Sequence, residues 1–390
     1  MSKRISISFA VSAAALASAV TFILTLSFTQ SRFNEKVKEV DRLSEKYQRL
    51  DELDRIIGEN YYTDVPEDAV TDYMLAGYVC GLGDKYSAYR SSSDMTTFDN
   101  GNTGIYTGIG ITISRNAAGE AEIIAVTENG PSEKAGLKVG DVIVEVEGIS
   151  VADHYTEAMS KISGEIGTTV SVRVRVKGTA AVTSCEVMRT QIEEVTVYSE
   201  MLEHHIGYIQ ITGFRTVTVT QFSNALHDVL TAGAEGIIFD LRDNGGGLLS
   251  ALEKMTDPIL PEGELAFSYN KAGEAETIVK SDAEKLDLPL VVLVNGNTAS
   301  AAELFACLLR DYAGAKLVGE KTFGKGIMQT TFSLSSGGVT LTTATYSTGK
   351  TPCYHEIGLE PDVLSVPEEG GETDTQRKAA EETIRAMVNS

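Results

Sequence analysis

The chain reads Leu288-Pro289-Leu290-Val291-Val292-Leu293-Val294 and then Asn297-Thr298-Ala299-Ser300-Ala301-Ala302-Glu303. The first run is apolar throughout, which predicts a buried strand. Apolar side chains then recur at helical spacing and predict an amphipathic helix; they are Leu304, Phe305, Leu308, Leu309 and Tyr312. The sequence therefore places Ser300 where a strand turns into a helix.

Ser300 admits two interpretations. Backbone N–H groups at the start of a helix lack partners and can stabilise an oxyanion, so a hydroxyl at this point suits nucleophilic catalysis. Ser300-Ala301-Ala302-Glu303 is also a capping box, in which Ser and Glu satisfy the first N–H groups of the helix. Taken alone, the capping box is the commoner explanation.

Lys325 is the candidate base for Ser300. It lies between Gly324 and Gly326, which let the backbone pack closely against its neighbours. A lysine in an apolar, water-poor site can lose its proton and act as a base. The following run, residues 327–332, has strand character, so positions 325, 327 and 329 share a face. Gln329 is therefore expected to reach Lys325 and hold it toward Ser300.

A glycine run, Gly245-Gly246-Gly247, follows a second apolar strand at residues 236–241. Glycines at the end of a strand can aim an N–H group into a cleft with no side chain in the way. We expect Gly246, or its neighbour Gly247, to form an oxyanion hole with the N–H of Ala301. The alternative is a tight turn that leads into a helix.

Other catalytic chemistries have little support. The chain has no Gly-x-Ser-x-Gly elbow, and no His-Glu-x-x-His or Cys-x-x-Cys motif, so neither a metal nor a cofactor is expected. Gly108-Ile109-Gly110 is too short for a dinucleotide fingerprint. His355, in Tyr354-His355-Glu356, is an alternative base for Ser300.

Three motifs, in this order, resemble the carboxyl-terminal processing peptidases, also called tail-specific proteases. The motifs are Asp240-Leu241-Arg242-Asp243-Asn244-Gly245-Gly246-Gly247-Leu248, residues 297–303 and residues 319–329. The resemblance spans about residues 66–385. It implies a serine–lysine dyad of Ser300 and Lys325, assisted by Gln329. The chain departs from the family at Gly245 and Lys85, where proline is usual; Lys85 lies in Leu82-Gly83-Asp84-Lys85-Tyr86-Ser87-Ala88-Tyr89.

Residues 104–187 change to short strands and turns that resemble a PDZ domain. Its motifs are Thr107-Gly108-Ile109-Gly110-Ile111, Gly130-Pro131-Ser132 and residues 135–143. A PDZ domain binds a peptide by adding it as a strand to a sheet edge. The resemblance implies that the loop amides of Thr107, Gly108 and Ile109 bind a terminal carboxylate, and that Ile109 and Ile111 face the last side chains.

The PDZ-like region lacks one family feature. The family often has Arg-Gly-x-x-Gly-Thr/Ser, whose arginine couples the PDZ domain to the catalytic lysine. Here the matching stretch is Ser163-Gly164-Glu165-Ile166-Gly167-Thr168. A serine hydroxyl cannot make the forked contacts of a guanidinium. Either the coupling is weak in this chain or another residue supplies the charge, and Arg173 and Arg175 are the candidates.

Lys3 and Arg4 precede an uncharged stretch from Ile5 to Gln30. Its length suits one membrane-spanning helix, and the basic residues place the N-terminus in the cytoplasm. The alternative is a secretory signal peptide cleaved at Ala17-Ser18-Ala19. We favour the retained anchor, because cleavage would leave an apolar new terminus. The expectation is a single-pass protein of the cell membrane whose catalytic part is extracytoplasmic.

Residues 33–57 carry a heptad-like apolar seam that can pair with a second copy or pack on the body; it comprises Phe33, Val37, Val40, Leu43, Tyr47, Leu50 and Leu53. The family often dimerises through terminal segments, which implies a homodimer. The predicted domains are residues 1–31 (cytoplasmic start and anchor), 32–103 (helical region), 104–190 (PDZ domain), 191–366 (protease core) and 367–390 (C-terminal helix).

The composition of the chain limits the kinds of partner and cross-link that we expect. The net charge of −22 on 390 residues argues against nucleic acid, whose phosphates would be repelled. Four cysteines, Cys80, Cys185, Cys307 and Cys353, form no dense disulfide framework. Cys80 and Cys307 fall in apolar helical stretches and are expected to be buried.

The predicted fold class is α/β: a crotonase- or ClpP-like serine protease core with an inserted β-rich PDZ domain and an N-terminal transmembrane helix. The predicted function is cleavage of extracytoplasmic proteins near their C-termini, with the PDZ domain binding substrate tails. The alternative is a non-catalytic PDZ adaptor on a protease-like fold, but such a descendant would be expected to lose Ser300, Lys325 or Gln329. A weaker alternative is a crotonase-like enzyme acting on acyl thioesters.

Overall fold

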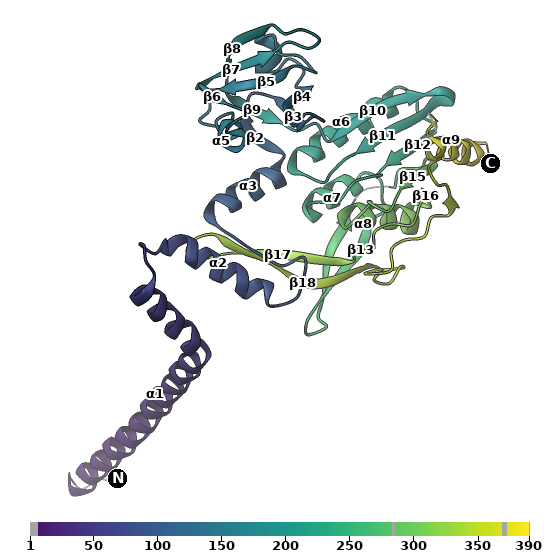
Figure 1. The fold of residues 1–390 in the computed structure, drawn as a ribbon. Coiled ribbons are helices and arrows are strands. Elements are labelled where there is room, and N and C mark those ends of the chain that lie inside the picture. The colour runs from purple at the N-terminus through teal and green to yellow at the C-terminus, as the bar shows by residue number, and fades with distance from the viewer. Residues whose placement is uncertain (1–6, 283–284, 369–372, 390) are drawn as a thin grey trace. The chain divides into compact units, whose positions relative to one another are not determined.

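The computed structural model describes residues 7–282, 285–368 and 373–389 (Figure 1). The chain divides into two compact units, Met1–Leu75 and Ala76–Ser390. The second unit contains both the β-rich region and the α/β core.

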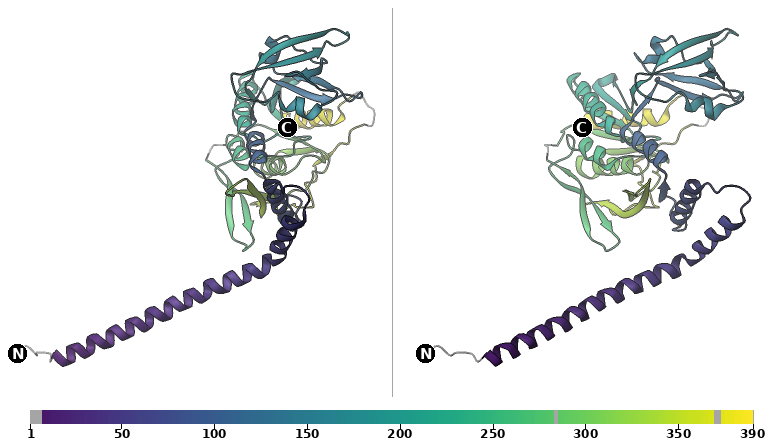
Figure 2. Two further views of the ribbon diagram at one scale, coloured as in Figure 1. Left: turned by 60° about the vertical axis from the view of Figure 1, so that its left-hand side comes forward. Right: turned by 90° about the vertical axis from the view of Figure 1, so that its left-hand side faces the viewer.

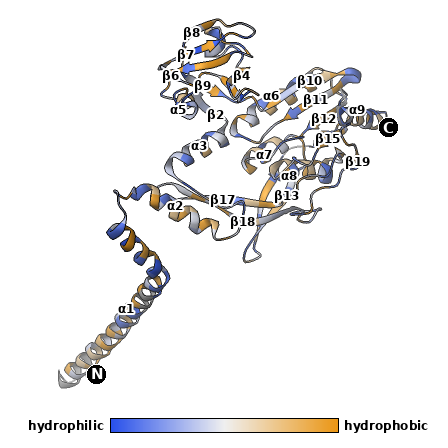
Figure 3. Cartoon of the chain, viewed as in Figure 1, coloured by the Kyte–Doolittle hydropathy of each residue, from blue (hydrophilic) through white to orange (hydrophobic). Residues whose placement is uncertain are grey.

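The first unit is dominated by one long helix, α1 (Ile7–Asn60), which is followed by the start of α2 (Glu67–Cys80) (Figure 2). The part of α1 nearer α2 alternates between hydrophobic and hydrophilic residues (Figure 3). Every member of the predicted seam is exposed; these are Phe33, Val37, Val40, Leu43, Tyr47, Leu50 and Leu53. The helix over residues 33–57 is therefore confirmed, and its apolar seam is exposed to solvent.

The expected membrane-spanning helix over residues 5–30 is not supported. Its first residues, up to residue 6, lie outside the described residues. In the part of the chain that is described, no helix is both long enough and apolar enough to cross a membrane. Hydroxyl side chains recur through the stretch and lower its hydropathy, at Ser18, Thr21, Thr25, Ser27 and Thr29.

The β-rich region is built on a sheet in the order β3-β4-β5-β7-β8, with β6 beside β5. Its strands are β3 (Ile111–Arg115), β4 (Ala121–Val126), β5 (Val142–Val146), β6 (Ile149–Ser150), β7 (Thr169–Arg175) and β8 (Val182–Met188). Two short helices, α4 (Pro131–Lys134) and α5 (Tyr155–Ser160), accompany it, and β2 (Ile105–Gly108) pairs with β9 (Thr190–Glu193). Alternate strand residues such as Val170, Val172 and Val174 are fully buried and form its core.

The α/β core is a second sheet in the order β10-β11-β12-β15-β16-β19. Its strands are β10 (Val197–Leu202), β11 (Ile206–Ile211), β12 (Gly236–Asp240), β15 (Leu290–Val294), β16 (Lys316–Gly319) and β19 (Val363–Leu364). All pairings are parallel except the antiparallel β10–β11 pair. The predicted strands at 236–241 and 288–294 are thus confirmed within a few residues.

Helices cover both faces of this core sheet, which is why its central strands are apolar throughout. On one face lie α6 (Thr216–Thr231), α7 (Leu249–Thr256) and α8 (Ala301–Leu308). On the other lies α9 (Thr375–Val388), which packs Ala380 and Ile384 against the strands (Figure 1). The predicted final helix is confirmed, with Asp374 as its N-cap.

A third sheet joins distant parts of the second unit. Its long central strand, β18 (Gly338–Thr348), pairs with β17 (Ile327–Ser333), with β13 (Gly263–Asn270) and with the short β1 (Ala88–Arg90); β13 also pairs with β14 (Ala275–Ser281). The chain next to β1 therefore meets the strands that follow Lys325. The helix α3 (Ser92–Thr103) comes directly after β1.

Two local predictions are wrong. The helix that begins after Ser300 is not amphipathic, because every residue of α8 is buried; its only charge, Glu303, is satisfied internally, so the helix can lie wholly inside the core. It continues as a π-helical turn, Leu309–Ala313. Cys80 is exposed at the end of α2, whereas Cys307 is buried as expected, and all four cysteines are unpaired.

Candidate active site

Ser300 follows strand β15 and immediately precedes α8, at the strand-to-helix junction that the sequence predicts. Its backbone has φ 59° and ψ −123°, in a region that non-glycine residues rarely occupy. Such a conformation costs about 1–3 kcal/mol and persists only where the surroundings enforce it. The junction thus holds the serine in a strained turn at the edge of the sheet.

The carboxylate of Glu303 joins the two halves of the site. Its Oε2 accepts hydrogen bonds from the N–H of Ser300 at 2.9 Å and of Lys325 at 2.8 Å. Its Oε1 accepts from Thr322 Oγ1 at 2.6 Å and from the N–H of Gly324 at 2.7 Å. Glu303 is fully buried, so this one side chain fixes the Ser300 and Lys325 backbones relative to each other.

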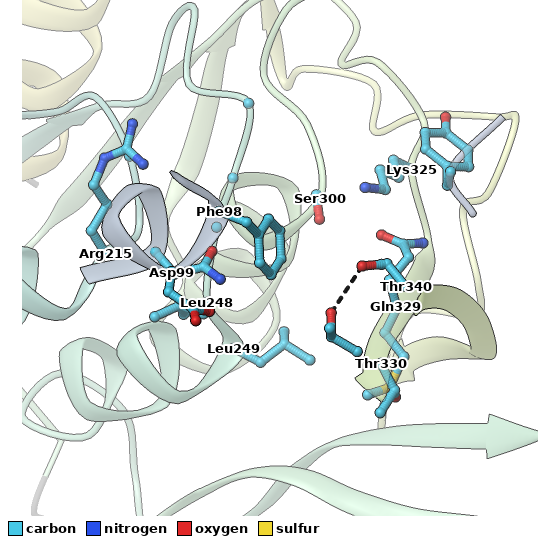
Figure 4. A pocket seen from close by; sticks show the side chains of 18 of the residues that line it. Phe98, Asp99, Arg215, Leu248, Leu249, Ser300, Lys325, Gln329, Thr330 and Thr340 are labelled. Carbon is cyan, nitrogen blue, oxygen red and sulfur yellow. Dashed lines mark hydrogen bonds between the residues drawn. The ribbon is translucent and has the colours of Figure 1, made fainter. Parts of the chain in front are cut away.

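Ser300 and Lys325 line one cleft of about 990 Å³. Figure 4 shows the amine of Lys325 pointing toward Ser300, with Leu248, Leu249 and Phe98 on the other side of the serine. Gln329 lines the same cleft, so the structure brings together all three predicted catalytic residues.

The amine of Lys325 lies in an environment that suits a base. Burial lowers the pKa of Lys325, and the positive charge of Lys85 acts in the same direction, whereas the charges of Asp84 and Glu303 oppose the shift. The net effect is a pKa below the ordinary lysine value. A larger fraction of the amine is therefore unprotonated near neutral pH than for a surface lysine.

Gln329 is not held in the way the strand alternation predicts. A register shift between Met328 and Gln329 interrupts the regular pairing of β17 with β18. The described hydrogen bond of the Gln329 amide goes to Thr342 Oγ1 at 3.3 Å. The residue thus lies in the cleft with Lys325 but is anchored to the neighbouring strand.

Two backbone N–H groups near Ser300 have no described hydrogen-bond partner: that of Ala301, the next residue in the chain, and that of Gly247, which lines the same cleft. The N–H of Gly246 is occupied, because it donates to Asn244 Oδ1 at 2.8 Å. A Cβ at Gly246 would lie 2.8 Å from the Ser300 Cβ, and one at Gly247 would lie 2.1 Å from the Phe214 oxygen. The glycines are therefore required for this close approach, and Gly247 rather than Gly246 offers the free donor.

The glycine loop is anchored by a chain of polar contacts. Asp240, fully buried, accepts from Tyr208 Oη at 2.6 Å and from Arg242, which also binds Asp374. Asn244 Nδ2 donates to the carbonyl of Ile211 at 2.7 Å. The carbonyl of Asn244 accepts from the N–H of Ala299 at 2.9 Å, which ties the loop to the residue before Ser300.

The alternative base, His355, does not line the cleft that holds Ser300. Its Nδ1 is buried without a described hydrogen-bond partner. Sequence reasoning missed the buried Tyr346, which lines the cleft and donates from its hydroxyl to the Lys325 carbonyl at 2.6 Å. Among the described residues, no group of three or more His, Cys, Asp and Glu side chains is arranged to hold a metal.

The four predicted peptide-binding residues, Thr107, Gly108, Ile109 and Ile111, line a second, smaller groove of about 330 Å³. Ile109 is almost fully buried at its base, and Tyr155 and Met159 complete the apolar wall. The groove runs beside β3, as a strand-adding peptide site requires.

The arginines proposed to replace the missing coupling residue are occupied elsewhere. Arg173 pairs with Glu145 at 2.6 Å and Arg175 with Glu120 at 2.7 Å, both within the β-rich region. The loop at residues 161–169 is instead held by the buried Arg189, which donates to the carbonyls of residues 161, 162 and 169. This guanidinium is therefore used within the β-rich region.

Comparisons with known proteins agree with this arrangement. The family model described as Peptidase family S41 matches residues 205–365, and the model described as PDZ domain matches residues 122–176. The chain is 31% identical to the carboxy-terminal processing protease CtpA of Bacillus subtilis, over 94% of this chain and 82% of that protein. It is 35% identical to a carboxyl-terminal-processing protease of Synechocystis, over 73% of this chain and 70% of that protein.

A crystal structure from Bacteroides fragilis, named as an S41 protease, has the same fold. The superposition gives a TM-score of 0.51 at 18% sequence identity, and covers 85% of this chain and 98% of the other.

Proposed function

The chain belongs to peptidase family S41, among the carboxyl-terminal processing proteases, and from that premise we propose that it cleaves proteins near their C-termini with Ser300 as nucleophile and Lys325 as base. The bridging of the Ser300 and Lys325 amides by one buried carboxylate, Glu303, carries this proposal. It makes the nucleophile and the base parts of one rigid unit.

The proposed reaction proceeds through an acyl-enzyme. Unprotonated Lys325 takes the proton of the Ser300 hydroxyl as Oγ attacks the peptide carbonyl carbon. The N–H groups of Gly247 and Ala301 stabilise the oxyanion that forms. The Lys325 ammonium then gives its proton to the departing amine. Water attacks the resulting ester with Lys325 again as base, which releases the new C-terminus and restores the serine.

The non-catalytic adaptor alternative accounts less well for the site. An adaptor needs the groove at residues 107–111 but has no use for a strained serine and a lysine of lowered pKa in one cleft. A thioester-acting crotonase would not need the peptide groove. The crotonase- or ClpP-like spiral implied for the core is likewise proposed, on the support of its mainly parallel sheet covered on both faces.

Recognition of substrate tails is tested with a model protein that ends in an apolar tail. The active chain is expected to release a C-terminal fragment, detected by mass spectrometry, and Ser300→Ala is expected to release none. Ile111→Asp, which puts a charge in the β-rich groove, should slow this cleavage about tenfold or more, because the apolar tail loses its contact surface. Hydrolysis of a short peptide too small to span both sites should be affected much less.

A model substrate whose last two residues are aspartates is the matched control, since it should be cleaved slowly by the unsubstituted chain. Equal cleavage of both tails, or no effect of Ile111→Asp, would show that the groove does not select substrates.

We further propose that α1 holds the protein at the cell membrane with its catalytic part outside the cytoplasm, and that the α1 seam pairs two copies. The support is the uncharged stretch after Lys3 and Arg4 and the exposed seam. Removal of residues 1–60 is expected to move the protein from the membrane fraction to the soluble fraction and to halve its mass by light scattering. Mature protein found in the medium, starting near Val20, would identify a cleaved signal peptide instead.

A further inference from the structure

A short segment far from the catalytic motifs, residues 84–87, lies against the catalytic lysine. Tyr86 lines the cleft together with Ser300 and Lys325. The segment is tied to the third sheet, because the N–H of Thr342 donates to Ser87 Oγ at 3.1 Å and the adjacent β1 pairs with β18. Thr342 also accepts the hydrogen bond from Gln329, so the segment and the glutamine share one anchor.

Two ammonium groups lie over the ring of Tyr86. Lys325 Nζ is 4.6 Å from the ring centroid, and Lys85 Nζ is 4.9 Å from it. A cation over an aromatic face at this distance is attracted by the ring quadrupole. The ring therefore favours one position of the flexible Lys325 side chain, which is half-buried and lines the cleft.

Asp84 is built into the same segment. Its carboxylate accepts from the N–H of Tyr86 at 3.0 Å and from Ser87 Oγ at 2.5 Å. Burial alone would raise the pKa of Asp84, but hydrogen bonds from Ser87, Thr342 and the Tyr86 amide, together with the charge of Lys325, lower it below the ordinary aspartate value. Asp84 is thus a fixed negative charge at neutral pH.

We propose that residues 84–86 form a positioning segment for the catalytic lysine, in which the Tyr86 ring holds the Lys325 amine and Asp84 and Lys85 place opposite charges near it. The proposal rests on the function proposed above, in which Lys325 is the base.

Two further elements meet Lys325. Glu303 on α8 contributes a negative charge and also holds the Lys325 backbone, and the hydroxyl of Tyr346 on β18 donates to the Lys325 carbonyl. Neither changes when residues 84–86 are substituted. The opposed effects of Asp84 and Lys85 can therefore be measured against a constant background.

The test is the pH dependence of kcat/KM for the full chain on a short reporter peptide. The limb of this profile that rises with pH reports the loss of the Lys325 proton. Asp84→Asn keeps an acceptor for the Tyr86 amide and removes the negative charge, so this rising limb should move to lower pH by about half a unit to one unit. Lys85→Gln should move it to higher pH by up to about half a unit, and less at high salt because Lys85 is exposed. Lys85→Arg, which keeps the charge, should leave the limb in place.

The contribution of the Tyr86 ring is tested separately from that of its hydroxyl. Tyr86→Leu should lower kcat about tenfold with a smaller change in KM, whereas Tyr86→Phe, which retains the aromatic face, should restore most of kcat. Asp99→Asn is the matched control for Asp84→Asn; Asp99 also lines the cleft but lies across Ser300 from Lys325 in Figure 4. It should not move the limb.

An independent readout is the NMR titration of lysine side-chain amines in the Ser300→Ala chain. The Lys325 signal is assigned as the one that disappears when Lys325→Arg is added. The Lys325 signal should shift with Asp84→Asn and Lys85→Gln in the same two directions. If both substitutions leave the limb and the titration unchanged while Lys325→Ala still abolishes hydrolysis, the positioning segment is wrong and the dyad stands. If Lys325→Ala hydrolyses peptides normally, the proposed function itself fails.

Discussion

Lys325→Ala is expected to abolish peptide hydrolysis, with kcat/KM reduced about 10⁴-fold or more, and Ser300→Ala is expected to have the same effect. Nucleophile and base act as one unit, so either loss removes the covalent route. Both side chains can be shortened without disturbing the Glu303 bridge, because it binds their backbone N–H groups. Steady-state hydrolysis of a reporter peptide measures the loss, and circular dichroism and thermal unfolding show whether the fold persists.

The pH dependence of hydrolysis follows from the direction in which the pKa of Lys325 is shifted. Because burial lowers its pKa, the active, unprotonated fraction should rise with pH and reach a plateau below the pH at which an ordinary lysine titrates. Gln329→Ala should cost less than either dyad substitution, since its described bond goes to Thr342 rather than to a reacting atom. A well-folded Lys325→Ala chain with ordinary turnover would rule out the dyad.

The sequence predicted the elements of the core because each has a strong local signal. Apolar runs at residues 236–241 and 288–294 become the central strands, and the junction after β15 places Ser300 at the start of α8. Glycines in a run after a strand indicated a close backbone approach, which Gly246 and Gly247 make. These features depend on neighbours in sequence, and periodicity reports such neighbours well.

What the sequence could not supply was the meeting of distant segments. The local sequence identifies Glu303 only as a capping residue of its helix. Its second role, as acceptor for residues 322–325, appears only because that segment lies beside α8. Tyr86 lies more than two hundred residues before Lys325, and no local pattern links them. The register shift before Gln329 breaks the strand alternation on which its placement relied.

The α8 prediction failed for a related reason. An apolar stripe indicates which side of a helix is buried but not whether the opposite side is covered as well. Ala302 and Ala306 on α8 are as fully buried as Phe305, because the sheet and neighbouring helices enclose the whole helix. A helix that is buried all round can carry a charge only where partners satisfy it, and this requirement leads directly to Glu303.

Glu303→Gln is expected to cost both stability and activity, although it changes only one atom of the side chain. Four donors surround the carboxylate: the N–H groups of Ser300, Gly324 and Lys325 and the hydroxyl of Thr322. An ionised carboxylate accepts all four, whereas a glutamine amide presents two hydrogens of its own on one side. In one orientation the amide N–H₂ faces Gly324 and Thr322, and in the other it faces Ser300 and Lys325.

Either orientation leaves at least one buried N–H without an acceptor, at about 1–3 kcal/mol for each unpaired group. The orientation that spares Gly324 releases Ser300 and Lys325 together, which removes the bridge and lets the strained serine relax. Thermal unfolding should therefore occur at a lower temperature, and kcat should fall about 100-fold or more with a smaller change in KM. Glu303→Asp retains the charge but is one methylene shorter, so it should keep part of the activity that Glu303→Gln loses.

The matched control is Glu360→Gln, an exposed glutamate paired with Lys321 at 2.7 Å, which should change neither quantity measurably. The measurement is made below the unfolding temperature of each variant, so that loss of kcat is not loss of folded protein. A Glu303→Gln chain with the stability and turnover of the unsubstituted protein would mean that the Ser300 and Lys325 amides need no common acceptor. In that case the rigidity of the dyad would have to come from the packing of α8 alone.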